Sequence, residues 1–446
     1  MKDFQTSTVQ LPAASETTLD LAFHFGIDIL DDSINHVHKH TVSSNIQISS
    51  VTILCLSYVC AYIGLKGCES YLFDLSHGAA GKDSAFDKAS ELILGPVIDA
   101  QNIRKANYDH SRQGSDENLP VKSYHCIHTS DATEQGIIIG FETTKAQLIA
   151  IGETSNKLRK KEDPLMNFIT RLYGKKNIMK PNYKKDLGSG GDLNINDISI
   201  FFYGNSNFQM LGKNIFTHHL VGGSINRCVL VFNTKARPFE ERPESYDLPE
   251  SVIKDTHETV KYLMAYGAES ASKVKPKLVK TDEYIAFDKY IYDLTNMYAG
   301  SEIEYLFKRV MQNLNAFIYT FHYLKNAQDG VCSDEIDATT VSLGINYMKY
   351  VLEGYNALID ELIGASAEVR EEDNIAKLHA VILSLANKKN VLKLKHRDVY
   401  RAAHLTRKQY DKYIFGMRYK TDKKFLHVLP ELAVTFVTGD KTKEVA

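Results

Sequence analysis

The stretch from Tyr71 to Ser84 constrains the fold more than any other part of the chain. It starts as an apolar run, passes through small residues and then presents Lys82 directly after Gly81. Backbone N–H groups in a small-residue loop, together with the N-terminus of the next helix, bind phosphate oxygens, and a lysine neutralises their charge. The stretch therefore predicts a strand, a phosphate-binding loop and the start of a helix.

The loop departs from the usual phosphate-loop pattern at two positions. Ser76 stands in place of the first glycine, and Asp83 stands where a magnesium-binding Ser or Thr is usual. We expect Ser84, or Asp83 beside it, to help position Mg²⁺. The residues expected to bind the phosphates of ATP are Ser76, Gly78, Gly81, Lys82, Asp83 and Ser84.

The composition predicts a soluble globular protein, with 43% hydrophobic and 24% charged residues in a chain of 446. The net charge of −2 argues against a uniformly basic surface but leaves room for basic patches. Six cysteines without paired metal-ligand spacing favour reduced thiols in the cytoplasm. Residues 1–16 do not resemble a signal peptide, and we expect the serine-containing apolar stretch 46–65 to be a buried helix, not a membrane segment.

Short apolar strands separated by helical patterns predict an α/β fold with a parallel sheet. Further strands are expected at 121–127, 146–151, 198–203 and 228–232. Helical spacing marks residues 84–94, which end before Gly95-Pro96, and the polar residues 101–120 are expected to form a turn-rich surface excursion. Later helices are expected at 254–266, 282–299, 302–326 and 333–363.

Composition shifts predict four regions in the chain. Residues 237–244 form a charged, proline-bearing linker. From Asp373 onward we expect three short helices, including 375–386 and one from Thr406, before a strand at 425–429. That order is typical of a winged helix. The predicted regions are an N-terminal helical region (1–66), the core (67–240), a helical bundle (241–370) and a winged-helix-like domain (371–446).

Three residues after the loop are candidates for nucleotide chemistry. Glu153 ends the strand 146–151 and could orient an attacking water, although Gly152 occupies the place of the usual metal-binding Asp. Asn205 could sense the γ-phosphate, and Arg227 could act across a subunit interface. The structural alternatives are an exposed glutamate at a strand end, a turn asparagine and a salt-bridged arginine.

The order of these features resembles a family of P-loop proteins of phages, satellites and plasmids, often found behind primase or primase-polymerase domains. In that family the loop often reads Gly-Lys-Asp, as at 81–83, and a strand ends in Asp-Glu, which Gly152-Glu153 matches with one residue lost. A Gly-Phe-x-x-Arg-like turn resembles residues 223–227. The resemblance covers about residues 47–400 and implies a RecA-like or AAA-type ATPase core, oligomeric and connected with DNA replication.

Two basic clusters are candidates for DNA binding, because phosphate contacts need a high density of positive charge. The first lies between the Glu153 strand and the Asn205 strand, where the alternative is a solvated helix face. The second lies in the predicted winged helix, where the alternative is a protein partner. The residues in question are Lys175, Lys176, Lys180, Lys184, Lys185, Arg397, Arg401, Arg407, Lys408 and Arg418.

The sequence thus predicts a RecA-like or AAA-type P-loop ATPase core followed by a helical lid or bundle and a C-terminal winged helix. The expected function is that of an ATP- and Mg²⁺-dependent, helicase-like DNA motor of phage or mobile-element replication. We expect a homo-oligomeric ring whose partner is DNA, with host or phage replication proteins as further candidates and no membrane. The alternatives are a non-motor replication initiator or helicase-recruiting adaptor, favoured by Gly152, and a purely structural ring.

Overall fold

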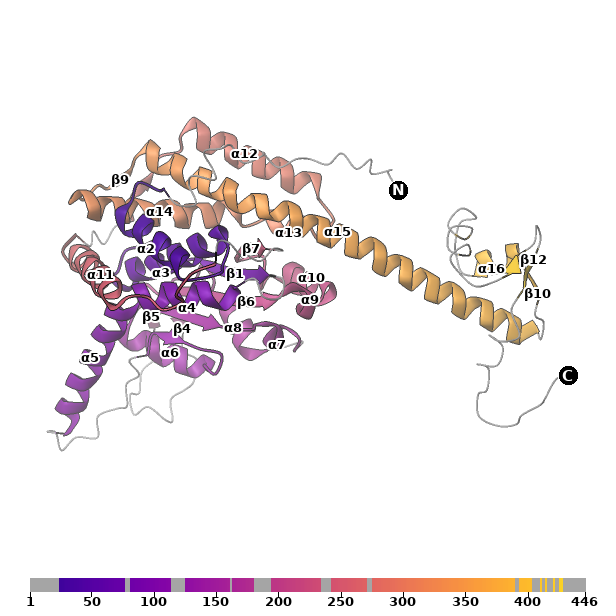
Figure 1. Ribbon diagram of the computed structural model, residues 1–446, viewed down its shortest axis with the longest axis horizontal. Helices are drawn as coiled ribbons and strands as arrows, with labels where there is room; N and C mark the ends of the chain where they lie inside the picture. The colour runs from indigo at the N-terminus through magenta and orange to yellow at the C-terminus, as the bar shows by residue number, and fades with distance from the viewer. Residues whose placement is uncertain are drawn as a thin grey trace. The chain divides into compact units, whose positions relative to one another are not determined.

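The chain forms two compact units, residues 1–359 and 360–446, shown in the computed structural model of Figure 1. The predicted boundary at 240/241 therefore separates segments of one unit. The residues that the structure describes are 24–76, 81–113, 125–160, 163–179, 194–233, 242–270, 275–389, 393–402, 410, 414, 420–421 and 425–427.

A five-stranded parallel sheet forms the centre of the first unit. Its strand order is β2-β3-β6-β1-β7, so β1 pairs with β6 on one side and β7 on the other. The predicted parallel sheet is confirmed, and the predicted strand 146–151 coincides with β3. The strands are β1 (Tyr71–Ser76), β2 (Ile127–His128), β3 (Ala146–Ile151), β6 (Ser199–Asn207) and β7 (Val229–Asn233).

Helices cover both faces of this sheet, because side chains alternate between the faces along each strand. On one face, Tyr58 of α3 (Asn45–Tyr62) contacts the ring of Phe201, and Phe86 of α4 (Lys82–Ile93) stacks on Tyr203 at 4.1 Å. On the other face, the hydroxyl of Tyr71 donates to the carbonyl of Ile169 in α8 (Pro164–Leu172). The core is thus a helix, sheet, helix arrangement.

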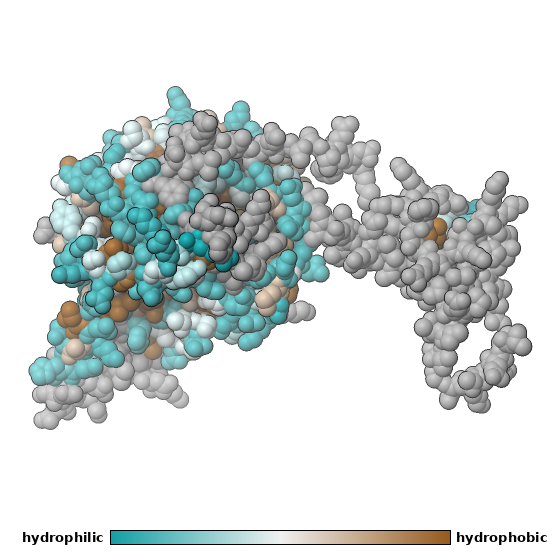
Figure 2. Space-filling model, viewed as in Figure 1, coloured by the Kyte–Doolittle hydropathy of each residue, from teal (hydrophilic) through white to brown (hydrophobic). Residues whose placement is uncertain are grey.

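Helix α3 is buried on all sides, since every residue from Gln47 to Ala61 is buried. Its small hydroxyl groups bond to the helices that cover it: Ser50 Oγ lies 2.8 Å from Tyr347 Oη, and Ser57 Oγ lies 2.8 Å from Thr320 Oγ1. Among the described helices it alone is long and apolar enough to cross a membrane, yet 83% of its span is buried inside the protein. The surface in Figure 2 is accordingly mostly hydrophilic where its residues are described.

The remaining helices of the first unit surround this core, with α2 and α14 packed against α3 (Figure 1). A two-stranded antiparallel hairpin, β4 and β5, precedes β6. These elements are α2 (Asp28–Lys39), α5 (Gly95–Gln113), α6 (Glu134–Thr143), α7 (Ser155–Leu158), β4 (Asn177–Met179), β5 (Asn194–Asn196), α9 (Phe208–Leu211), α10 (Lys213–Gly222), α11 (Glu250–Ser270), β8 (Lys277–Leu278), α12 (Asp282–Met297), α13 (Glu304–Phe307), α14 (Val310–Asp329) and β9 (Glu335–Ile336). The helix α15 (Ala338–Lys389) begins in the first unit and ends in the second.

Two predictions about helix ends differ from the structure. Residues 101–113 belong to α5, which starts at Gly95. Gly95-Pro96 ends the preceding helix and also begins the next one, because proline is well tolerated in the first turn of a helix. Residues 338–389 form one helix, so the predicted boundary at 370/371 lies inside α15. No glycine or proline occurs from Ala365 to Lys389, so no residue in this stretch ends the helix.

The second unit has its own small core around a three-stranded antiparallel sheet. Its strands β10 (Lys393–Lys395), β12 (Phe425–His427) and β11 (Lys420–Thr421) lie in that order, and α16 comprises His396–Ala402. Seven buried residues form the core: Leu378, Ile382, Leu394, Val399, Tyr410, Ile414 and Leu426. The winged helix stays a prediction, because most of the helix expected from Thr406 lies outside the described residues.

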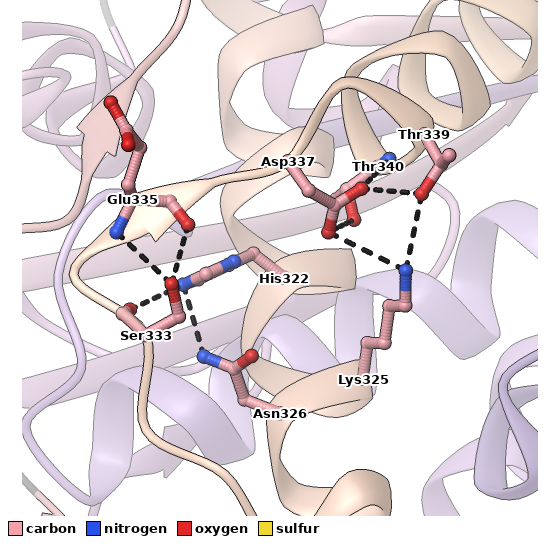
Figure 3. A network of polar contacts seen from close by, with 8 residues as sticks. All are labelled: His322, Lys325, Asn326, Ser333, Glu335, Asp337, Thr339 and Thr340. Carbon is pink, nitrogen blue, oxygen red and sulfur yellow. Dashed lines mark hydrogen bonds and ion pairs between the residues drawn. The ribbon is translucent and has the colours of Figure 1, made fainter.

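The connection from α14 to α15 is fixed by polar contacts (Figure 3). The backbone N–H of Thr340 donates to Asp337 Oδ1 at 2.8 Å, so Asp337 caps the N-terminus of α15. Burial alone would raise the pKa of the Asp337 carboxyl, but hydrogen bonds from Thr339 and Thr340 and the ammonium group of Lys325 hold that pKa well below its usual value. Asp337 is therefore ionised in the folded protein at neutral pH.

We expect Asp337→Ala to lower the free energy of unfolding by about 1–2 kcal/mol at pH 7, because α15 loses its cap. A carboxyl group with a lowered pKa in the folded state stabilises the protein above its unfolded pKa of about 4, and that contribution fades as the pH falls further. The difference from wild type should therefore shrink between pH 7 and pH 3 in urea titrations. Asp334→Ala, at an exposed position, is the control, and an equal loss there would contradict the capping role.

Candidate nucleotide-binding site

The carboxyl ends of the parallel strands lie at one edge of the sheet, and the predicted phosphate loop is at this edge. β1 ends at Ser76 and α4 begins at Lys82, as a strand, loop and helix start require. Residues 77–80, with the predicted phosphate ligand Gly78, lie outside the described residues, and the Lys82 side chain is not described. The site is therefore described from the two ends of the loop, Ser76 and Gly81.

The end of the loop is held against the turn that precedes α3. Gly81 has φ +72°, and its carbonyl accepts hydrogen bonds from Ser43 Oγ at 2.6 Å and from the backbone N–H of Ser84 at 3.1 Å. A Cβ at position 81 would lie 2.9 Å from Ser43 N and from Val42 Cγ2. Both the backbone conformation and this close approach require glycine.

A buried carboxamide, that of Gln47, ties α3 to the ends of two strands. Its Nε2 donates to Asp74 Oδ2 and to Ser76 Oγ, both at 2.8 Å, and its Oε1 accepts from Asn233 at 3.3 Å. Gln47 also completes a capping box with Ser44. This role is not visible in the sequence: the Ser-x-x-Gln spacing signals a helix start, but nothing in it shows that the side chain reaches β1.

Asn205 links the first turn of α4 to the end of β3. It lies on β6, where Gly204 is paired with Ile151. Its Nδ2 donates to Asp83 Oδ1 at 2.7 Å, and its Oδ1 accepts from the backbone N–H of Glu153 at 2.9 Å. The structure thus brings together three positions that the sequence analysis singled out separately.

Glu153 has an uncommon backbone conformation for a residue with a side chain. Its φ is +49°, and its Oε1 accepts hydrogen bonds from Ser155 Oγ at 2.5 Å and from Ser206 Oγ at 3.2 Å. A carboxylate held by two hydroxyl groups is fixed in direction beside the loop, where it can accept a hydrogen bond from a water molecule.

The side chains around α4 create an acidic environment. Burial raises the pKa of Asp87, and the negative charge of Asp83 raises it further. Burial also raises the pKa of Tyr203 well above its usual value, with added contributions from the carboxyl groups of Asp74, Asp83 and Asp87. Such a field favours the binding of cations at this edge.

The oxygen donors at this edge fit Mg²⁺. In the described part of the chain no group of three His, Cys, Asp or Glu residues could hold a metal alone. Mg²⁺ in nucleotide sites needs no such group, because one or two carboxylates act together with the phosphates of the substrate. Asp83 and Ser84 are the residues that would hold the ion, which would neutralise phosphate charge when bound.

Arg227 lies at the opposite edge of the sheet, just before β7. It contacts Gly223 O, and its guanidinium lies 5.9 Å from the centre of the Tyr173 ring. Burial lowers the pKa of Arg227, and the nearby Arg309 lowers it further. Within one chain, therefore, Arg227 is not brought together with Asn205 and Glu153.

The candidate DNA-binding residues are described only in part. Lys175 and Lys176 are exposed and directly precede β4, at the same end of the sheet as Arg227. Arg397 and Arg401 are exposed on α16. The other candidates, Lys180, Lys184, Lys185, Arg407, Lys408 and Arg418, lie outside the described residues.

A parallel sheet with helices on both faces, and a strand, loop and helix start at the interior strand β1, is consistent with a P-loop ATPase core. Among solved structures, a candidate ATPase from Cytophaga hutchinsonii aligns with a TM-score of 0.31 and 12% identity over 73% of this chain and 87% of that chain. A full-length MCM homologue from Methanopyrus kandleri aligns with a TM-score of 0.36 and 9% identity over 76% of this chain and 62% of that one.

No family model and no curated protein matches the chain. The chain spans less than two thirds of the MCM homologue, at 62% of its length. Likenesses of this size carry no argument about function, which rests on the residues of the site.

We expect Gln47→Leu to lower the free energy of unfolding by about 1–3 kcal/mol, because it removes one hydrogen-bond donor from each of the buried groups of Asp74 and Ser76. Asn45→Leu, two residues earlier on the same helix, is the matched control and should cost less than about 1 kcal/mol. Urea titrations of both variants measure the difference. Equal losses would show that Gln47 does not support the strand ends.

Proposed function

We propose that the chain is a P-loop ATPase that binds ATP and Mg²⁺ at the carboxyl edge of its sheet. The observation that carries this proposal is the carboxamide of Asn205, which contacts both Asp83 at the start of α4 and the backbone of Glu153 at the end of β3. A phosphate loop, a carboxylate at a neighbouring strand end and a polar side chain between them are the parts that phosphoryl transfer needs.

Each part has a distinct role in the proposed mechanism. Lys82 binds the β- and γ-phosphates, and Ser76, Gly78, Gly81, Asp83 and Ser84 complete the loop that surrounds them. Glu153 orients the attacking water, and Asn205 fixes the loop and Glu153 relative to each other. Arg227 would reach a nucleotide only on another copy of the chain, because it lies at the amino edge of its own sheet.

The finer proposal is a helicase-like DNA motor in the replication of a phage or mobile element, acting as a ring in the cytoplasm. Support for a DNA partner comes from exposed basic residues in both units, Lys175 and Lys176 in the first and Arg397 and Arg401 in the second. The biological setting rests on the family resemblance of the sequence. Host or phage replication proteins are candidate partners on the same basis.

A second candidate is a non-motor replication initiator or adaptor that binds nucleotide without efficient turnover. Two observations favour it: Gly152 lacks the usual metal-binding carboxylate, and the Glu153 carboxylate is already engaged by Ser155 and Ser206. Binding of specific duplex DNA that needs no ATP would support this candidate. ATP-driven strand separation would contradict it.

We expect Lys82→Ala to lower the rate of ATP hydrolysis, with or without single-stranded DNA, by about 100-fold or more, because it removes the cation on the transferred phosphate. Lys88→Ala is the matched control on the same helix, where the Lys88 side chain is 18% exposed and its ammonium group pairs with Glu91. Its rate should stay within about twofold of wild type. A phosphate-release assay measures both, and hydrolysis indifferent to Lys82→Ala would overturn the proposed site.

We expect the double substitution Arg397→Ala and Arg401→Ala in the full chain to weaken DNA binding for all sequences and to reduce the slope of log affinity against log salt by about 2. The matched control is Lys261→Ala with Lys289→Ala, which removes two exposed charges from α11 and α12. Fluorescence anisotropy with labelled duplex DNA at several salt concentrations measures the slope. An equal change in the control would mean that net charge alone is responsible.

A further inference from the structure

Two departures from the usual pattern of a P-loop ATPase, one in the loop and one at the end of β3, are complementary. Position 83 carries a carboxylate where a hydroxyl is usual, and position 152 carries no side chain where a carboxylate is usual. The two positions are far apart in the sequence, so their relation is visible only in the fold.

The structure places these two positions next to each other. A Cβ built on Gly152 would lie 4.0 Å from Asp83 Oδ1, and among the described residues no other heavy atom outside its chain neighbours comes within that distance. The carboxylate of Asp83 thus lies beside the space into which a side chain at 152 would extend.

The Asp83 carboxylate is held in place by Asn205, which also contacts the residue after Gly152. Asn205 Nδ2 donates to Asp83 Oδ1 at 2.7 Å, while Asn205 Oδ1 holds the backbone N–H of Glu153, the residue next to Gly152. One carboxamide therefore sets the position of the Asp83 carboxylate relative to the end of β3.

We propose that Asp83 supplies, from the first turn of α4, the carboxylate for the nucleotide-bound Mg²⁺ that P-loop ATPases usually carry at the end of this strand, the position of Gly152. The inference rests on the proposed function, since it assigns a ligand to the cation of that site. The negative charge that is absent at position 152 is then present at position 83 instead. Mg²⁺ accepts carboxylate oxygens readily, and one or two of them suffice beside the phosphates.

The backbone at Gly152 permits a direct test by exchange. Gly152 is not among the glycines with positive φ, and the nearest atom leaves room for a side chain. The variant Asp83→Ser with Gly152→Asp restores the usual pattern at both positions. The variant Asp83→Ser with Gly152→Ala is its matched control, with the same added Cβ but no carboxylate.

The experiment measures the affinity of the full chain for a fluorescent N-methylanthraniloyl ATP in excess Mg²⁺ and in excess EDTA. The ratio of the two dissociation constants is the Mg²⁺ effect, which needs no turnover. Asp83→Asn keeps an oxygen that can accept from Asn205, so the fold is retained while the charge is lost. We expect it to reduce the Mg²⁺ effect about tenfold or more. Asp99→Asn, at an exposed position of α5, is the control for loss of charge and should leave the effect unchanged.

In the exchange variant, Asp83→Ser with Gly152→Asp, we expect the Mg²⁺ effect to return to within about threefold of wild type, whereas the Ala control stays low. A binding titration with Mn²⁺, followed by its electron paramagnetic resonance signal in the presence of ATP, should give the same order of variants. Thermal unfolding without nucleotide checks that each variant is folded.

The outcomes separate this inference from the proposed function. A wild-type chain that binds no ATP would overturn both. A wild-type chain with a Mg²⁺ effect that survives in Asp83→Asn would overturn only the inference, with Asp83 then a helix-start residue bonded to Asn205. Loss in Asp83→Asn without recovery in the exchange variant would also overturn it, because positions 83 and 152 would then not be interchangeable.

Discussion

The burial of α3 around its whole circumference is the constraint on which the first unit depends. A helix that is apolar on every side must be covered on every side, so the sheet lies against one side of α3 and α14 against another. Its N-terminus then meets the carboxyl edge of the sheet, where Gln47 bonds to Asp74 and Ser76. The base of the phosphate loop is therefore supported by a helix that precedes it in the chain, and the predicted lead-in and bundle belong to one unit with the core.

The two edges of the sheet have different electrostatic character. Carboxyl groups gather at the carboxyl edge, where Asp83 raises the pKa of Asp87, whereas Arg227 and Arg309 lie close together at the amino edge. With a rise of about 3.3 Å per residue, a strand of five or six residues separates these edges by roughly 17–20 Å. The carboxyl edge thus favours cations, and the amino edge favours anions. The two groups of charges are further apart than the screening length at physiological salt, so neither weakens the field of the other.

Local patterns predicted the elements but not the contacts between them. The strand 146–151 follows from its apolar run, and the helix expected over 84–94 is present as α4, which begins two residues earlier, at Lys82. The polar residues 101–113 predict turns, yet they continue α5, because Pro96 in its first turn favours a helix start. The approach of Asp83 to Gly152 could not be predicted, since it depends on the pairing of β3 with β6 and on the reach of Asn205.

At the end of β3, the residue with a side chain has the backbone conformation that favours glycine, and the glycine does not. Glu153 has φ +49°, a conformation that costs a residue with a Cβ about 1–2 kcal/mol and glycine almost nothing, while Gly152 stands where positive φ is not required. Backbone preference alone would exchange the two residues. Asn205 stabilises this conformation by accepting from the N–H of Glu153 and, through its backbone carbonyl, from the N–H of Thr154 at 2.7 Å. Strain that neighbouring groups maintain is a mark of functional sites. The Glu153 side chain is thus kept at an energetic cost, and the small residue at 152 leaves the space beside it to Asp83.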